Sequence, residues 1–313
     1  MGDLLMSLPV VHALRRSFPE ARLTLLIKQD LLPLLEGHPD LDEILAFDPA
    51  EGQGWAEMLR WGSRLRSHRF DTALVLNPTR LFHVAVFLAG IPRRIGYRRK
   101  WGFLLSAGLE DTKSIRKRRE VDYNLELLEA LDIQNPTVEL SLPTTADQDE
   151  EAGSLLHLND RPGKPAPIAL HPWTSNPVKG LPLDWFQNVA EELNRRGRAV
   201  VWIGEPDSGP RVEGYAPGLD LTGKIPLRLL PAALKRCALL ISNDSGPVHA
   251  AAAVGTPVIV VAPESHKTTL ERWEPIGQGH TLLFSPTVQE TVDSADRLLS
   301  KGSLDADRPG LRK

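Results

Sequence analysis

The stretch Ile241-Ser242-Asn243-Asp244-Ser245-Gly246-Pro247-Val248-His249-Ala250-Ala251-Ala252 decides the fold class of this chain. Its apolar beginning is typical of a buried strand, and its small-residue end is typical of a helix. Ser245 is expected to accept a hydrogen bond from backbone N–H groups of the first helical turn. Gly246 lets the backbone approach a ligand closely, and Pro247 suits the first turn because its missing N–H costs nothing there.

A strand that leads directly into a helix places the helix N-terminus at the carboxyl end of a sheet. Free N–H groups and the helix dipole both favour an anion at such a position, which makes it a phosphate site. Each charge held there gains about 0.3–1 kcal/mol. The local sequence fits an ordinary capped helix equally well, so the phosphate site needs support from other segments.

Four segments resemble one family, the ADP-heptose:lipopolysaccharide heptosyltransferases of glycosyltransferase family 9. Residues 243–253 resemble its nucleotide-site motif, and Gly2-Asp3-Leu4-Leu5 with Leu8-Pro9 resembles its opening. His171-Pro172-Trp173-Thr174-Ser175, followed by Lys179 and Pro182, resembles its pyrophosphate segment. Residues 89–97 resemble its acceptor-domain segment, nearer the enzyme that adds the second core heptose. The segments occur in a consistent order over nearly the whole chain.

Composition is that of a soluble globular chain, because 42% of the 313 residues are hydrophobic and 25% are charged. No apolar run reaches the 18 or so residues of a membrane span, and no basic, apolar signal peptide opens the chain. The single cysteine, Cys237, excludes an internal disulfide and fits a reducing cytoplasm. No metal or cofactor is expected, since no Cys/His cluster has zinc spacing.

Apolar strands alternate with amphipathic helices along the chain, which predicts an α/β fold with parallel sheets. Strands are expected at residues 23–27, 44–47, 73–76, 168–171, 199–203, 239–241, 258–261 and 281–284. Helices are expected at residues 4–18, 54–68, 80–89, 121–131, 183–196, 226–236, 246–254 and 288–301.

Residues 159–167 hold three prolines and a glycine and are expected to be a linker. Residues 1–158 would form an acceptor-binding Rossmann-like domain, and residues 168–313 a Rossmann-like domain for the nucleotide sugar. The C-terminal helix is one candidate for packing back on the first domain. The resemblance implies the GT-B arrangement, two doubly wound parallel-sheet domains that face a cleft.

The resemblance assigns the donor diphosphate to one group of residues. Thr174, Ser175 and Lys179 follow the strand at residues 168–171, and a lysine can approach a phosphate as a point charge. Ser245, Gly246, Pro247, Val248 and His249 open the helix described above. Asp244 is expected to orient donor hydroxyls or to cap its own helix. Glu205, at the end of a strand, suits the ribose hydroxyls.

Asp3 is expected to be the catalytic base, because the resemblance points the Asp of the Gly-Asp pair toward the acceptor. General base catalysis contributes about 10²–10⁴ in rate, and one displacement at the anomeric carbon would invert its configuration. The alternative role for Asp3 is a helix N-cap.

Basic residues gather between residues 91 and 119, where ten Lys and Arg stand against Glu110 and Asp111. We expect an anionic partner for this segment or a solvated face. RNA is disfavoured because the segment matches no RNA-binding motif, so no nucleic acid is expected. Kdo carboxylates or acceptor phosphates would meet Asn77, Arg80, Arg98, Arg99 and Lys100.

The function expected from the resemblance is heptose transfer from ADP-heptose to a Kdo- or heptose-lipid A acceptor, by an enzyme peripheral on the inner face of the inner membrane. A change of donor or acceptor within the family, and a non-catalytic sugar-nucleotide-binding paralogue, stay open. A dinucleotide oxidoreductase is disfavoured because no Gly-x-Gly-x-x-Gly follows a strand. Heptose epimer, acceptor hydroxyl, the choice of first or second heptose and oligomeric state do not follow from these motifs.

The family places an apolar strand directly before Gly2-Asp3, and here only Met1 precedes that pair. We expect the 313-residue form to lack this central strand, through a mis-called start or truncation. Losing about six buried apolar residues, at roughly 1.5–3 kcal/mol each, would at its upper range exceed a typical total stability of about 5–15 kcal/mol. The prediction is a less stable or inactive chain than an upstream-extended form. Equal melting curves and equal turnover of the two forms would refute it.

Overall fold

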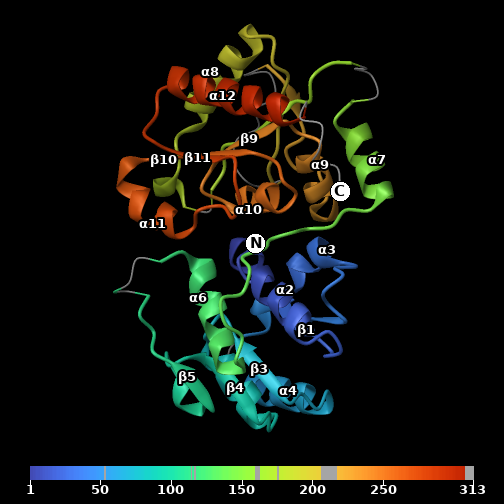
Figure 1. Cartoon of the computed structure of the whole chain (residues 1–313), viewed down its shortest axis with the longest axis vertical. Coiled ribbons are helices and arrows are strands. Elements are labelled where there is room, and N and C mark those ends of the chain that lie inside the picture. The colour runs from blue at the N-terminus through green and yellow to red at the C-terminus, as the bar shows by residue number, and fades with distance from the viewer. Residues whose placement is uncertain are drawn as a thin grey trace. The chain divides into compact units, whose positions relative to one another are not determined.

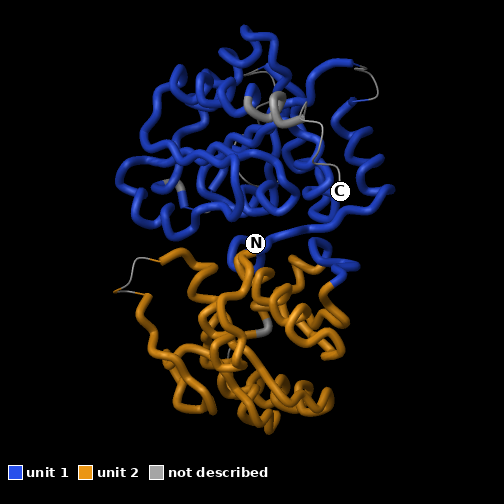
Figure 2. Tube along the Cα trace, in the orientation of Figure 1, with its two compact units in different colours: residues 1–5, 33–39, 139–313 blue, residues 6–32, 40–138 orange. Residues whose placement is uncertain are grey.

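The computed structural model describes residues 1–52, 54–113, 115, 118–158, 163–174, 176–205 and 217–306. The chain divides into two compact units (Figure 2). Unit 1 comprises residues 1–5, 33–39 and 139–313, and unit 2 comprises residues 6–32 and 40–138. The domain boundaries expected from the sequence stay a prediction, and residues 159–162 of the expected linker lie outside the described residues.

Unit 1 is built on a six-stranded sheet in which every pairing is parallel (Figure 1). The strand order is β11 (His280–Phe284), β10 (Val258–Ala262), β9 (Leu239–Asn243), β6 (Ile168–His171), β7 (Val200–Trp202) and β8 (Leu219–Asp220). The central strands β6, β9 and β10 are buried along their whole length and are apolar except at the carboxyl ends of β6 and β9, as in sheets covered by helices on both faces. The α/β fold class expected from the sequence is therefore confirmed.

Helices cover both faces of this sheet: α8 and α12 lie on one side and α9 and α10 on the other (Figure 1). Phe186 and Leu193 of α8 pack with Val292 of α12 against the strands in one core cluster. The helices of unit 1 are α1 (Gly2–Leu5), α7 (Ala146–Leu155), α8 (Leu183–Arg195), α9 (Leu230–Lys235), α10 (Gly246–Ala253), α11 (Lys267–Arg272) and α12 (Val288–Ala306); α3 (Leu32–Leu35) begins in unit 2 and ends in unit 1.

Unit 2 contains two separate parallel sheets. One pairs β1 (Thr24–Lys28) with β2 (Glu43–Phe47), and the other has the order β3 (Thr72–Val75), β4 (Arg93–Tyr97), β5 (Ala107–Leu109). Its helices are α2 (Leu8–Ser17), α4 (Trp55–Ser67), α5 (Arg80–Leu88) and α6 (Glu120–Glu126). A Cβ on Gly62 would lie 2.8 Å from Cβ of Leu88, so this glycine allows α4 and α5 to pack closely.

The structure departs from the expected elements at two places that matter for function. The helix expected at residues 4–18 is two helices, because α2 begins anew at Leu8 with Pro9 in its first turn, where a proline fits best. The strands β4 and β5 were not expected. β4 begins with Arg93 and Arg94, so its sequence lacks the apolar pattern of a buried strand. The two guanidinium groups donate to the backbone carbonyls of Ala130 and Leu104.

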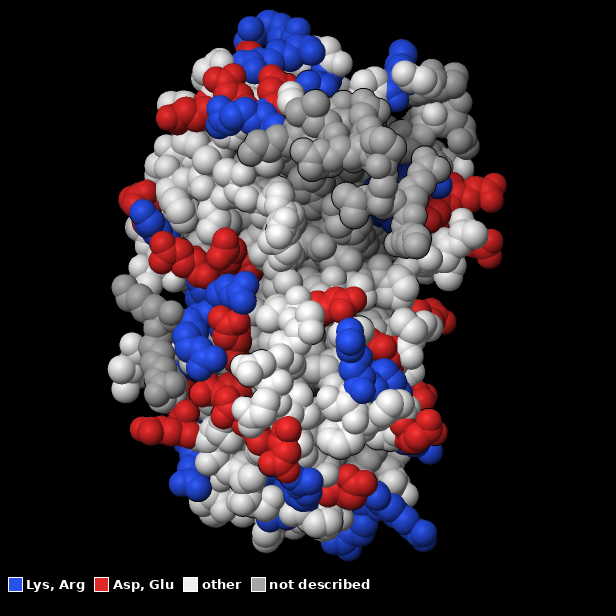
Figure 3. Space-filling view, in the orientation of Figure 1, with Lys and Arg blue, Asp and Glu red and all other residues white. Residues whose placement is uncertain are grey.

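Charges of both signs are interspersed on the face drawn in Figure 3. Within the described ranges, none of the helices combines the length and apolar character needed to cross a bilayer.

Candidate functional site

A cavity of about 880 Å³ lies at the carboxyl edge of the six-stranded sheet, entirely within unit 1. In parallel α/β sheets this edge is where ligands bind. The lining residues follow β6, β7, β8 and β9 and include part of α1: Met1, Gly2, His171, Trp173, Thr174, Ile203, Gly204, Glu205, Gly223, Lys224, Ile225, Pro226, Leu227, Leu230, Ser245, Gly246 and Pro247.

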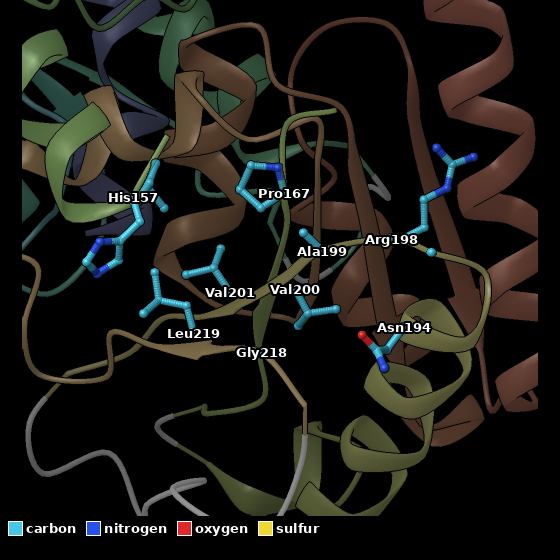
Figure 4. Close-up of a pocket in the computed structure, with 11 residues that line it drawn as sticks. His157, Pro167, Asn194, Arg198, Ala199, Val200, Val201, Gly218 and Leu219 are labelled. Atoms are coloured by element: carbon cyan, nitrogen blue, oxygen red, sulfur yellow. The ribbon is translucent and has the colours of Figure 1, made fainter. Parts of the chain in front are cut away.

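A second cavity, of about 350 Å³, lies at the opposite edge of the same sheet (Figure 4). Pro167, Val200 and Leu219 mark the amino ends of three strands there. The guanidinium of Arg198 in this cavity is already paired with Asp296 at 3.0 Å. Because parallel sheets bind ligands at the other edge, the 880 Å³ cavity is the candidate site.

Asn243, at the end of β9, fastens the loop that carries the expected phosphate ligands. Its fully buried side chain donates to the carbonyls of Pro172 at 2.6 Å and Leu181 at 3.1 Å, and accepts from the Leu181 amide at 2.9 Å. A Cβ on Gly180 would lie only 2.7 Å from its nitrogen, so a larger residue there would break the contact. Sequence analysis did not single out Asn243 as a positioning residue.

A buried polar cluster joins β6 to the beginning of α10. Nδ1 of His171 lies 3.2 Å from the Ser242 hydroxyl and 3.1 Å from the Ser245 hydroxyl, and the two hydroxyls are 3.0 Å apart. Burial lowers the pKa of His171 to about 4, so the imidazole is neutral near pH 7. The cluster fixes Ser245 without adding a charge.

This cluster corrects the expected role of Ser245. The residue is the N-cap of α10 with extended backbone, but its side chain makes no cap hydrogen bond. Its hydroxyl instead donates to the Asn243 carbonyl at 3.1 Å. The beginning of α10 therefore lines the cavity without a capping side chain. Pro247 has no N–H and the Val248 amide donates to the Ser245 carbonyl at 3.2 Å, so the helix dipole and the Gly246 amide are what favour an anion here.

Asp244 pairs with a histidine that the motifs did not indicate. Its Oδ2 lies 2.8 Å from Nε2 of His266, and both side chains are about nine-tenths buried. The Thr174 hydroxyl donates to the Asp244 carbonyl at 3.2 Å. Asp244 does not cap α10, so of its two expected roles only the orienting one stays a prediction. His266 lies in a 3₁₀ turn after β10, outside every motif, so no sequence signal marked it.

Helix α1 packs on α10 and brings Asp3 beside the site. A Cβ on Gly2 would lie 3.3 Å from the His249 ring, and one on Gly246 would lie 2.8 Å from Cβ of Met1. Leu4 and Leu5 are buried, whereas Asp3 is exposed in the first turn of α1. Asp3 is not an N-cap, because it lies inside the helix.

His249 is buried between α1 and Trp273, whose ring centroid is 6.4 Å away. Burial lowers its pKa to about 4. It does not line the cavity, and neither does the buried Val248. Their predicted contact with a ligand stays a prediction. The His249 ring packs against Gly2 and so helps to seat α1 on α10.

The other residues predicted to bind the sugar-nucleotide donor differ in whether they line the cavity. Thr174 and Glu205 line the cavity, Lys179 lies half-buried at the end of a 3₁₀ turn outside the lining, and Ser175 lies outside the described residues. Trp173, which belongs to the pyrophosphate motif but was given no role of its own, packs on Gly204, where a Cβ would lie 2.5 Å from the indole.

Lys224 is a further cation at the cavity that the motifs did not mark. Its ammonium donates to the Asp220 carbonyl at 2.7 Å, and its side chain is exposed.

The expected acceptor residues belong to unit 2, where all five are exposed. Asn77 and Arg80 follow β3, and Arg98, Arg99 and Lys100 follow β4. Since β3 and β4 are parallel neighbours, the five residues gather at one sheet edge.

Two other basic residues of this segment are paired with acidic side chains, which reduces the positive charge left to bind an anionic partner. Lys113 pairs with Glu120 at 2.5 Å and lies over the rings of Tyr97 and Tyr123, and Arg118 pairs with Glu126 at 3.3 Å. Arg116 and Lys117 lie outside the described residues.

Residues 58–298 match the model of glycosyltransferase family 9 (heptosyltransferase). Among curated proteins, the chain is 28% identical over 276 residues to lipopolysaccharide heptosyltransferase 3 of Escherichia coli K12, covering 82% of this chain and 78% of that protein. It is 24% identical over 338 residues to lipopolysaccharide heptosyltransferase 2 of Salmonella typhimurium, covering 96% of each.

Solved structures share the fold. A glycosyl transferase family 9 protein from Veillonella parvula has a TM-score of 0.84 at 19% identity, covering 96% of this chain and 95% of that one. The E. coli heptosyltransferase WaaC with ADP has a TM-score of 0.72 at 15% identity, covering 95% and 97%. The fold is thus that of the GT-B heptosyltransferases, as expected.

Replacing Asn243 with Ala should destabilise unit 1 and weaken ligand binding together. It leaves two buried carbonyls and an amide without their partner, at about 1–3 kcal/mol for each buried group left unsatisfied. Urea unfolding should show a lower free energy of unfolding, and calorimetry a weaker affinity for ADP. Asn194→Ala, at an exposed position of α8, is the control. Unchanged stability of Asn243→Ala would contradict the assigned role.

Stability should fall as the pH falls from 6.5 toward about 4, because His171 and His249 have folded pKa values near 4 against an ordinary 6.5. In this window the unfolded chain binds more protons than the folded one. Each residue then contributes a slope of up to about 1.4 kcal/mol per pH unit. Denaturant unfolding at a series of pH values measures that slope, which should be shallower in His171→Gln and His249→Gln. Slopes equal to that of the unsubstituted chain would disprove the assignment, whatever the variants' absolute stability.

Proposed function

Since the chain belongs to glycosyltransferase family 9, the heptosyltransferase family, we propose that it transfers heptose from ADP-heptose to the lipopolysaccharide inner core with inversion. The observation that carries the proposal is the uncapped beginning of α10 in a cavity of about 880 Å³, with Asp3 held beside it by α1. The names of the relatives, lipopolysaccharide heptosyltransferases 2 and 3, support the substrate class.

The donor diphosphate would lie against the first turn of α10, where N–H groups and the helix dipole attract negative charge. The Thr174 hydroxyl lies against this turn through its bond to the Asp244 carbonyl. Lys179 would approach from the loop that Asn243 fastens, and Lys224 from the far side of the cavity. Glu205 would accept hydrogen bonds from the ribose hydroxyls.

The paired carboxylate of Asp244 is suited to orient the donor sugar. His266 occupies Oδ2, which fixes the plane of the carboxylate. A carboxylate held in one orientation directs its remaining lone pairs at hydroxyl groups more reliably than a mobile one.

Transfer needs one displacement. The acceptor oxygen bonds to the anomeric carbon as the bond from that carbon to the diphosphate oxygen breaks, and the acceptor proton passes to the Asp3 carboxylate. The ADP departs as a stable anion, so no protein acid is required. Attack opposite the leaving group inverts the anomeric configuration.

The acceptor would be a Kdo- or heptose-lipid A molecule, whose phosphates and carboxylates suit Asn77, Arg80, Arg98, Arg99 and Lys100. Such an acceptor is anchored in a membrane. The enzyme would accordingly work on the cytoplasmic face of the inner membrane as a peripheral protein.

Asp3→Asn should lower kcat by about 10²–10⁴ and leave ADP affinity within about twofold, because the base acts only in the transition state. Transfer from ADP-heptose to Kdo-lipid A, with and without one heptose already attached, measures turnover, and calorimetry measures ADP binding.

Asp147→Asn is the matched control, since Asp147 is also an exposed acid in the first turn of a helix of unit 1. Unchanged kcat in Asp3→Asn would remove Asp3 from the mechanism. ADP binding without any transfer would favour the non-catalytic alternative.

A further inference from the structure

Unit 2 carries a connected aromatic cluster in which Trp101 packs against the core and two neighbouring rings are exposed. The rings of Trp55 and Trp101 lie 5.7 Å apart, and those of Trp101 and Phe103 lie 6.0 Å apart. Trp55 is 62% exposed and Phe103 is 77% exposed. Leu59, one helical turn after Trp55, is 59% exposed. We call these four residues the aromatic patch.

Three cations precede the aromatic patch in the same loop. Arg98, Arg99 and Lys100 are all exposed and lead directly into Trp101. The backbone turns sharply there, since Lys100 has a φ of 55° and the Gly102 amide donates to the Arg99 carbonyl at 3.0 Å. Arg99 also lies 3.6 Å from Asp111, so part of its charge is compensated. Large apolar side chains and exposed cations thus share one surface loop.

The composition of this surface fits one kind of partner. Tryptophan has an apolar body and a polar N–H, and it prefers the headgroup level of a bilayer. Arginine and lysine beside it are attracted to anionic headgroups. An exposed apolar patch rimmed by charge marks an interaction surface, and the positive rim favours a negatively charged one.

We propose that the aromatic patch docks unit 2 on an anionic phospholipid surface, with Trp55, Leu59, Trp101 and Phe103 entering the interface. The expectation of a lipid partner rests on the proposed function, because its acceptor is anchored in a membrane. Docking at this surface holds the loop of Arg98, Arg99 and Lys100 at the level of the headgroups, where the phosphates of an anchored acceptor lie.

Vesicle sedimentation with the full chain tests the proposal. The bound fraction should be high with phosphatidylcholine vesicles that contain phosphatidylglycerol, low with phosphatidylcholine alone, and reduced by added salt. The double variant Trp55→Ser/Phe103→Ser should partition about tenfold more weakly. Phe18→Ser, an exposed aromatic outside the aromatic patch at 41% exposure, is the control and should bind normally.

Two further measurements separate docking from folding and from catalysis. Acyl chains carrying bromine should quench the fluorescence of the unsubstituted chain more than that of Trp55→Phe, which keeps an apolar ring but loses the reporter. With detergent-dispersed acceptor, Trp55→Ser/Phe103→Ser should turn over at the unsubstituted rate.

A vesicle-bound fraction that does not change with the aromatic substitutions, or that does not depend on the anionic lipid, would overturn the proposal. So would self-association of the chain, seen by sedimentation velocity, that the double variant abolishes. If vesicle binding depends on the aromatic patch but no heptose transfer is detected, the proposed function is contradicted and the docking surface is still supported.

Discussion

The loop between Pro172 and Leu181, which carries residues of the candidate site, depends on the side chain of Asn243, which is buried where β9 ends. It joins that strand to both ends of the turn between Pro172 and Leu181. An unmade hydrogen bond inside a protein costs more than a made one contributes, so these three bonds act together to define one loop geometry. Gly180 is the companion constraint, because only a residue without Cβ leaves the amide room. Thr174 and Lys179 are presented by a backbone that Asn243 holds.

Neutral polar groups support the helix terminus at this site. His171, Ser242 and Ser245 satisfy one another and the Asn243 carbonyl without any charge. Because burial lowers the pKa of His171 to about 4, its imidazole stays neutral and the cluster stays uncharged across the physiological pH range. The Ser245 hydroxyl is thus held in this cluster and makes no cap hydrogen bond to α10.

The sequence predicted most of the fold and several residues that line the candidate cavity, but few of the contacts among them. Buried strands such as Val258–Ala262 and the motif around Asp244 are local patterns, so periodicity and spacing found them. The strand Arg93–Tyr97 was not predicted because two arginines interrupt its apolar pattern. Their guanidinium groups donate to the backbone carbonyls of Ala130 and Leu104, which the local sequence does not indicate. His266 was not predicted for a similar reason. Its partner Asp244 lies 22 residues away, and the sequence around neither residue indicates that the two form a pair. Ser245 was misassigned because its local pattern is that of a cap, whereas a histidine 74 residues away takes its hydroxyl.

Charge balance at the cavity explains why the pairing of Asp244 matters. A carboxylate directly before the α10 N-terminus would compete with a phosphate for the same dipole, since both are anions. Its Oδ2 lies 2.8 Å from Nε2 of His266, and this contact fixes the orientation of the carboxylate. Lys224 supplies a cation at the same cavity, while Asp3 stands on a different helix whose packing on α10 rests on Gly2 and Gly246. On the proposed roles, Asp244 would orient the donor, Asp3 would take the acceptor proton, and a phosphate would lie at α10, whose N-terminus no side chain caps.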